Sequence, residues 1–259
     1  RARPRRPAAE RLRLVSPLTA VYLGFDVALL KEISTHHATE CARGVAPVAR
    51  STVARAQTAT NSARLRIAYL SRDFRDHEVE HVLANVFALH DRACFEVYAY
   101  SYGPDDGSAY RKAIAAGVDR FVDAHAMTDA ELAAHIDEAG IQVLIDLAGH
   151  TTGNRMPVLA RRPAPIQAHY LGFAATTGAS YIDYFITDRV ATPPELAAGF
   201  VEKLAYVPQC FMVSDGTDGS PAVVEALGMG ATNVYYNLEG LEPSLISYQE
   251  DGSGVLGND

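Results

Sequence analysis

Residues 140–155 read GIQVLIDLAGHTTGNR, a nearly continuous apolar run followed by a polar turn. The run at 141–147 is typical of a central strand in a parallel sheet, covered by helices on both faces. Asp146 stands near its end, where an unpaired buried carboxylate would be costly. We therefore expect Asp146 to bond backbone amides, a histidine or a ligand. A carboxylate that merely caps the following turn fits this segment equally well.

Strand and helix patterns alternate on both sides of this run. Thr128 and Glu131 have the spacing of a capping box and predict a helix that ends near Gly140. Further strands are expected at 65–71, 95–101, 120–123, 165–171 and 183–187, with helices at about 79–91, at 108–117 and after Pro193-Pro194. Such alternation indicates right-handed βαβ units, and hence a Rossmann-like, doubly wound parallel sheet of the α/β class.

The chain divides into four segments by pattern. Residues 1–43 predict a helical segment, with one helix or a helix pair at 16–43 that breaks near Gly24. Its first 13 residues hold six arginines and one glutamate. This basic stretch fits a solvated linker or part of a longer helix; the alternative is a contact with an acidic partner or with lipid headgroups. Residues 44–63 are a linker, and 64–213 form the α/β lobe. Residues 214–259 are turn-rich and acidic, either the vestige of a second lobe with a strand near 233–236 or a disordered end.

Composition narrows the class of protein. A net charge of −8 over 259 residues argues against a nucleic-acid partner that binds across the whole molecule. Cys41, Cys94 and Cys210 are odd in number and far apart, which fits a reducing cytoplasm better than a disulfide framework. The chain has no apolar run of about 18 residues, so we expect no membrane partner. It starts with Arg1 rather than Met, which indicates a piece of a longer protein.

The loop after the first predicted strand reads RDFRDHEVEH, residues 72–81. Ligands of doubly wound sheets bind at the carboxyl ends of strands, which is where this loop lies. His77 and His81 are four residues apart, and a histidine beside a carboxylate can accept a proton near neutral pH. Surface histidines in solvent are the main alternative. A metal site is weaker, because no third ligand is positioned and HEVEH is not the HExxH motif.

Two later segments carry polar groups at strand ends. Asp146, His150 and Thr151 fall in a loop with the content of a sugar- or phosphate-binding turn. Gly172 and Gly178 bracket a small-residue loop whose amides could approach a phosphate, and His169 is expected to be a satisfied core or interface histidine. No strand is followed by a glycine fingerprint with an acid about 20 residues later, which excludes a dinucleotide-binding domain.

Taken in order, these segments resemble the protein O-GlcNAc transferase/SPINDLY family of glycosyltransferases. The resemblance rests on LRIAYLSRDFRDHEVEH (65–81), FEVYAYSYGPDDGSAYRKAI (95–114), GIQVLIDLAGHTTGNR (140–155) and the stretch that opens with RRPAPIQAHYLGF (161–173). Residues 16–43 also resemble the helical segment that joins the family's tetratricopeptide (TPR) repeats to its catalytic half. The similarity covers roughly residues 16–213.

The resemblance implies the N-terminal lobe of a GT-B enzyme, which has two Rossmann-like lobes and its active site between them. Such an enzyme transfers a sugar from a nucleotide diphosphate donor, here expected to be UDP-GlcNAc, to Ser or Thr of a protein acceptor, with inversion and without metal or cofactor. The chemistry needs a proton acceptor and a positive environment for the leaving diphosphate. The implied catalytic residues are His77, Asp146 and His150, with His77 as general base. The implied substrate-binding residues are His81, Thr151, Arg155, Thr176, Thr177 and Gly178.

Three positions depart from the family pattern. Ala174 and Ala175 replace a Pro-Gly pair, Glu78 replaces a proline or small residue, and Gly240 stands where a diphosphate-binding lysine is expected. Most of the second lobe and the upstream repeats lie outside the chain, so we expect little or no transferase activity from the chain alone. The alternatives are a non-catalytic remnant that serves as a protein-interaction module, and a fucose rather than a GlcNAc donor.

Overall fold

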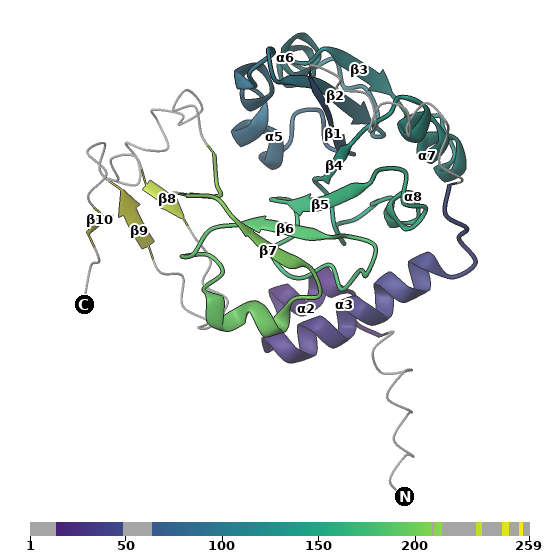
Figure 1. Cartoon of the computed structure of the whole chain (residues 1–259). Helices are drawn as coiled ribbons and strands as arrows, with labels where there is room; N and C mark the ends of the chain where they lie inside the picture. Colours follow the sequence, from purple (N-terminus) through teal and green to yellow (C-terminus); the bar gives the residue numbers. More distant parts are fainter. Residues whose placement is uncertain are drawn as a thin grey trace, which may run out of the picture.

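The computed structural model describes residues 14–48, 64–208 and 210–213, together with the backbone of three short strands beyond them (Figure 1). A seven-stranded sheet has the order β3-β2-β1-β4-β5-β6-β7, and every neighbouring pair is parallel. The order reverses between β1 and β4, which makes that boundary the topological switch point. The strands are β1 (Leu65–Ser71), β2 (Phe95–Ser101), β3 (Arg120–Asp123), β4 (Val143–Asp146), β5 (Ile166–Tyr170), β6 (Tyr184–Thr187) and β7 (Lys203–Tyr206). The predicted doubly wound α/β fold is confirmed.

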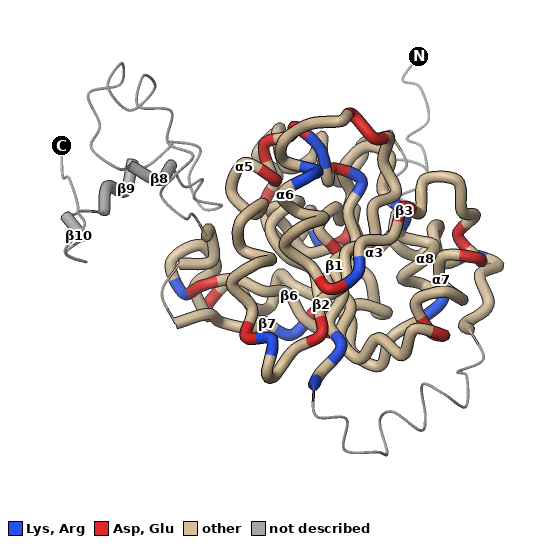
Figure 2. The backbone as a smooth tube through the Cα atoms, turned by 90° about the horizontal axis from the view of Figure 1, so that it is seen from above, with Lys and Arg blue, Asp and Glu red and all other residues tan. Residues whose placement is uncertain are grey.

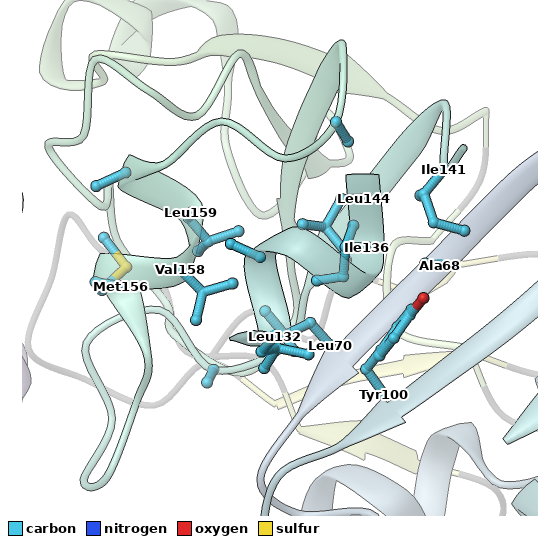
Figure 3. Packing of buried hydrophobic residues seen from close by; sticks show 14 of the residues in the cluster. Ala68, Leu70, Tyr100, Leu132, Ile136, Ile141, Leu144, Met156, Val158 and Leu159 are labelled. Carbon is cyan, nitrogen blue, oxygen red and sulfur yellow. The ribbon is translucent and has the colours of Figure 1, made fainter. Parts of the chain in front are cut away.

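Helices cover both faces of the sheet. Ile67 and Tyr69 of β1 pack with α5 (Glu78–Leu83), the 3-10 helix η1 (Val86–Leu89) and α6 (Ala109–Gly117). The alternate residues Ala68 and Leu70 pack on the opposite face with α7 (Asp129–Glu138) and α8 (Met156–Ala160), as Figure 3 shows. Burial of each large apolar side chain contributes roughly 1.5–3 kcal/mol. The central strands are therefore held rigidly from two sides, and the polar loops at their ends start from fixed points.

The N-terminal segment is a pair of helices, α2 (Pro17–Tyr22) and α3 (Val27–Ala42). The break falls at Gly24, as predicted, and Asp26 caps α3 by accepting a hydrogen bond from the Leu29 amide at 2.9 Å. Leu30 and Ile33 share a buried cluster with Phe173 and the loop after β5. Both helices lie along the lower edge of the lobe in Figure 1, close to η2 (Pro194–Gly199). This segment therefore packs directly on the loop that carries candidate site residues.

Several element predictions need correction. The predicted helix at 79–91 is divided into α5 and η1, and the short connection brings His90 to the Tyr69 hydroxyl at 2.9 Å. The helix after Pro193 is the 3-10 helix η2, while β4 is shorter than the apolar run at 141–147. The sequence patterns missed α8 and β7. The capping box of α7 is present as predicted, with Thr128 and Glu131 bonding each other's backbone amides.

Beyond residue 213 the structure describes only backbone. The strands β8 (Thr232–Val234), β9 (Leu245–Tyr248) and β10 (Gly254–Val255) form an antiparallel sheet, and β8 overlaps the strand predicted near 233–236. Gly240, the basic segment 1–13 and the predicted linker beyond residue 48 lie outside the described residues. The domain boundaries at 44–63 and 214–259 stay predictions.

Charge and hydropathy add two observations. Acidic and basic positions are interspersed along the described tube in Figure 2. Among the described helices, none combines the length and the apolar character that a membrane crossing needs.

Candidate active site

The loops after β1 and β4 open on the same rim of the sheet. Leu70 and Asp146 are partners in the parallel register of these strands. Beyond them, Nη1 of Arg72 donates a hydrogen bond to the Thr152 carbonyl oxygen at 3.0 Å. The two polar turns that the sequence singled out therefore meet across the topological switch point, where ligands of doubly wound sheets bind.

His77 is the N-cap of α5 and lies in the first of these turns. Its Nδ1 accepts a hydrogen bond from the Val79 amide at 3.3 Å, so a neutral ring carries its proton on Nε2. Nε2 lies 3.8 Å from Oδ2 of Asp73, beyond hydrogen-bond distance. Oδ1 of Asp73 accepts from the Arg75 guanidinium at 3.0 and 3.2 Å. To accept a proton at Nε2, the ring must adopt the other tautomer and give up its bond to Val79.

His81 belongs to a different group of contacts. Its Nε2 lies 2.7 Å from Oδ1 of Asp76, and its ring lies 4.6 Å from the ring of Tyr110, which comes from α6. The Asp76 amide in turn donates to Asp106 in the loop after β2. His81 thus faces the β2 side of the rim, away from the β4 turn. Within the described residues no three His, Cys, Asp or Glu side chains are grouped as a metal site.

Asp146 is 2% exposed and fully bonded to its surroundings. Its carboxylate accepts from the amides of Ala148 at 3.3 Å and Gly149 at 2.7 Å, and it lies 3.0 Å from Nδ1 of His169. Nε2 of His169 lies 3.0 Å from the Phe173 carbonyl oxygen. The carboxylate therefore bonds amides and a histidine, as predicted, and it ties the β4 turn to the loop after β5. His169 is the satisfied core histidine that the strand pattern indicated.

His150 is a buried histidine with a lowered pKa. Its Nε2 lies 2.6 Å from the Thr177 carbonyl oxygen, which fixes the proton on Nε2 of the neutral ring. Burial lowers the pKa of His150 to about 4, with smaller contributions from the nearby His37 and His169. The His37 ring, on α3, lies 6.4 Å away. At neutral pH the ring is therefore uncharged, and Nδ1 is its remaining proton-accepting atom.

The Thr176–Thr177–Gly178 loop is held by hydrogen bonds to the buried carboxylate of Glu202. The hydroxyl of Thr176 donates to Oε2 of Glu202 at 2.6 Å, and the amide and hydroxyl of Thr177 donate to Oε1. All three side chains are buried. Gly178 has φ +67° and lies directly against the backbone of Ser34 and Thr35 in α3. The side chains of this loop are thus engaged within the chain, and the loop forms the seat of α3.

Thr151 and Arg155 complete the predicted set. Thr151 is half-buried, and its carbonyl oxygen accepts from the Asn154 side chain at 2.8 Å. Arg155 binds Asp129 at 2.6 Å and the Met127 carbonyl oxygen at 2.7 Å. Its guanidinium therefore anchors the β4 loop to the start of α7.

Sequence reasoning missed three groups that contact or adjoin the candidate residues. Glu202 has no motif signal, because its role depends on a loop 25 residues earlier in the chain. Glu80 is 0% exposed within α5, although its charge predicts a solvent-facing position. The Tyr102 hydroxyl, just after β2, is buried and makes no hydrogen bond within the described part of the chain. Burial raises its pKa well above the usual range, and the charges of Asp146 and Asp73 raise it further.

A seven-stranded parallel sheet whose polar loops meet at the switch point defines a Rossmann-like ligand-binding lobe. Residues 6–227 match the family described as glycosyl transferase family 41. The chain belongs to that family.

Relatives and a solved structure agree with this assignment. The chain is 36% identical over 206 residues to the Arabidopsis thaliana protein named probable UDP-N-acetylglucosamine--peptide N-acetylglucosaminyltransferase SEC, covering 78% of this chain and 21% of that protein. It is 40% identical over 156 residues to the Caenorhabditis elegans UDP-N-acetylglucosamine--peptide N-acetylglucosaminyltransferase, covering 60% and 14%. A mutant O-GlcNAc transferase from Thermobaculum terrenum superposes with a TM-score of 0.65 at 32% identity, covering 73% of this chain and 35% of that one. The chain thus spans about a fifth or less of these curated relatives.

Proposed function

We propose that the chain is the N-terminal lobe of a protein O-GlcNAc transferase. The whole protein transfers GlcNAc from UDP-GlcNAc to Ser or Thr hydroxyls of proteins, with inversion and without a metal or cofactor. The observation that carries the proposal is the meeting of the His77 and Asp146 turns at the switch point of a family 41 lobe. The names of the relatives support the donor and the peptide acceptor.

The lobe supplies the acceptor side of the reaction. A Ser or Thr hydroxyl needs a group that receives its proton as the sugar is transferred. His77, half-exposed at the rim, is the proposed proton acceptor, and Asp73 faces the nitrogen that would carry the proton. His150 is neutral at working pH and is proposed to contact substrate rather than to carry charge.

The remaining predicted residues are proposed to shape the site. Asp146 holds the Gly149–His150 turn through its amide bonds, and Arg155 holds the other end of the same loop. Thr176 and Thr177 act through Glu202, so the loop reaches a ligand through backbone groups rather than hydroxyls. Donor diphosphate contacts belong to the second lobe, and we expect the chain alone to have little or no activity.

The decisive experiment uses the complete protein that contains this chain. It is incubated with a peptide mixture and either UDP-GlcNAc or GDP-fucose, with and without a chelator, and modified hydroxyls are found by mass spectrometry. GlcNAc transfer that survives the chelator supports the proposal in full. Transfer from GDP-fucose alone would mean that the protein uses a fucose rather than a GlcNAc donor. Absence of transfer from both donors would favour a protein-interaction module.

The His77 assignment has its own test. His77→Ala in the complete protein should abolish most of kcat, because no proton acceptor then remains at that position. His125→Ala, which changes an exposed histidine beyond β3, is the matched control and should keep its activity. Full activity of His77→Ala would remove the proton-acceptor role while leaving the family assignment in place.

A further inference from the structure

Glu80 is a buried acid directly beneath the His77 turn. It lies in the first turn of α5, where its amide donates to the His77 carbonyl oxygen at 2.9 Å. The residue is 0% exposed, and neither carboxyl oxygen makes a well-formed hydrogen bond within the described part of the chain. An ionised carboxylate in such a place would lose its hydration without replacement. The geometry therefore requires the neutral acid.

The surroundings of Glu80 favour the same form. Burial raises the pKa of the Glu80 carboxyl well above its usual range, and the charge of Asp73 raises it further. The Ser71 hydroxyl, which favours the ionised form, opposes this rise without cancelling it. The negative charge of a nearby carboxylate disfavours ionisation of a second carboxyl group, which is the direction seen at Glu80.

Besides Asp73, the elements around Glu80 carry other charged or titratable groups. η1, with sequence VFAL, contributes none. The guanidinium of Arg75 is bound to Asp73, and that of Arg111 to the Phe74 carbonyl oxygen, so each is already engaged. The groups include Asp73 and Arg75 in the loop after β1, His77 at the N-cap of α5, Glu78 and His81 on α5, Tyr102 after β2 and Arg111 on α6.

We propose that Glu80 is a positioning residue of the candidate site: as a neutral acid it adds no second negative charge beside Asp73, which faces His77. This proposal rests on the proposed function and deepens it. Asp73 is then free to bind Arg75 through one oxygen and to face Nε2 of His77 through the other. Ionisation of Glu80 would repel Asp73 and disturb the turn that holds His77.

Carboxyl NMR tests the protonation state directly. The chain is labelled with ¹³C at the glutamate carboxyl carbons, and the resonance that disappears in Glu80→Gln is assigned to Glu80. We expect this resonance to show a protonated carboxyl at about pH 7, unlike the bulk of the glutamates. The exposed Glu138→Gln is the matched control and should leave the Glu80 resonance in place. An ionised Glu80 at neutral pH overturns the proposal.

The pH dependence of the free energy of unfolding is a second test, and it does not depend on the assignment of NMR resonances. A raised folded-state pKa means that the folded chain binds more protons than the unfolded chain, so the contribution of Glu80 is lost as pH rises. Glu80→Gln cannot ionise. The free energy of unfolding of Glu80→Gln should therefore increase relative to that of the wild type as pH rises. Glu138→Gln, which keeps Glu80, is the matched control. A difference for Glu80→Gln that stays constant with pH counts against the proposal.

The functional consequence is measured on the complete protein. The ratio of kcat/KM for Glu80→Gln to that of the wild type should rise by about threefold or more between neutral and alkaline pH, because only the wild type gains a second charge beside Asp73. A ratio that does not change with pH would mean that Glu80 has only a packing role. Absence of transferase activity would instead remove the proposed function, while the carboxyl resonance still decides the state of Glu80.

Discussion

Nδ1 of His169 lies 3.0 Å from Oδ2 of Asp146, and both side chains are almost completely excluded from solvent. The same carboxylate accepts two backbone amides of the turn that presents His150. One carboxylate thereby joins the ends of two neighbouring strands. The shape of the β4 turn depends on a residue from β5 as much as on its own sequence.

Asp146→Ala should therefore destabilise the chain by about 3–5 kcal/mol, because it leaves His169 and two amides without their buried partner. Asp146→Asn keeps one oxygen, which can still accept from the Gly149 amide and face His169, and it should cost less than Asp146→Ala. Chemical denaturation of the two variants beside the wild type measures both free energies. Losses near zero in both variants would mean that the carboxylate is not the joint between the strands.

Thr177→Val should cost about 1–3 kcal/mol, since it removes a hydroxyl bond to the buried carboxylate of Glu202 while keeping the side-chain shape. The exposed Ser180→Ala, three residues later, is the control and should change the free energy of unfolding by less than about 0.5 kcal/mol. Thermal or chemical denaturation is sufficient. A Thr177→Val chain as stable as the control would show that the loop does not rely on Glu202.

Gly178→Ala should cost more than Gly107→Ala, although both glycines have φ +67°. The strain of a left-handed alanine is about 1–2 kcal/mol and is common to both. Only at position 178 does the added Cβ overlap the backbone of α3, whereas nothing lies within 4 Å at position 107. The difference in unfolding free energy isolates the contact with α3, and a difference near zero would argue against that contact.

Acid should weaken the fold partly through His150. Its pKa is about 4 in the folded chain against a usual value of 6.5, so the unfolded chain binds a proton first as pH falls. The contribution of the neutral ring is complete above the usual value and is lost between there and pH 4. We expect a loss of about 2 kcal/mol at pH 5 from this group.

His150→Gln removes this acid sensitivity. The fall in unfolding free energy from about pH 7.5 to pH 5 should be smaller in the variant by that amount, even if the variant starts lower because it loses the bond to Thr177. Parallel pH dependences of the two chains would contradict the assigned cause.

The sheet was predictable because its strands carry their own signals. The apolar run before Asp146, the alternation of strand and helix, and the capping box of Thr128 all depend on residues close in sequence. β7 was missed because its four residues, KLAY, are too short and too mixed to show a period. The predicted helix at 79–91 is divided into α5 and η1, and the contact of His90 with Tyr69, 21 residues away, is not visible in local spacing.

The site was predictable in part for the same reason. That the His77 and Asp146 turns share one rim follows from parallel strands and was confirmed. The partners of these groups were harder to foresee. Glu202, His169 and Glu80 act through contacts across the fold, and neither spacing nor residue type reveals which acid is buried.

The close seating of α3 on residue 178 has a practical meaning for protein engineering. A chimera that transplants this lobe but begins at residue 64 would leave an uncovered hollow where Ser34 and Thr35 now lie. It would also lose the His37 ring that lies beside His150. A chimera that includes this lobe should therefore also include residues 14–48.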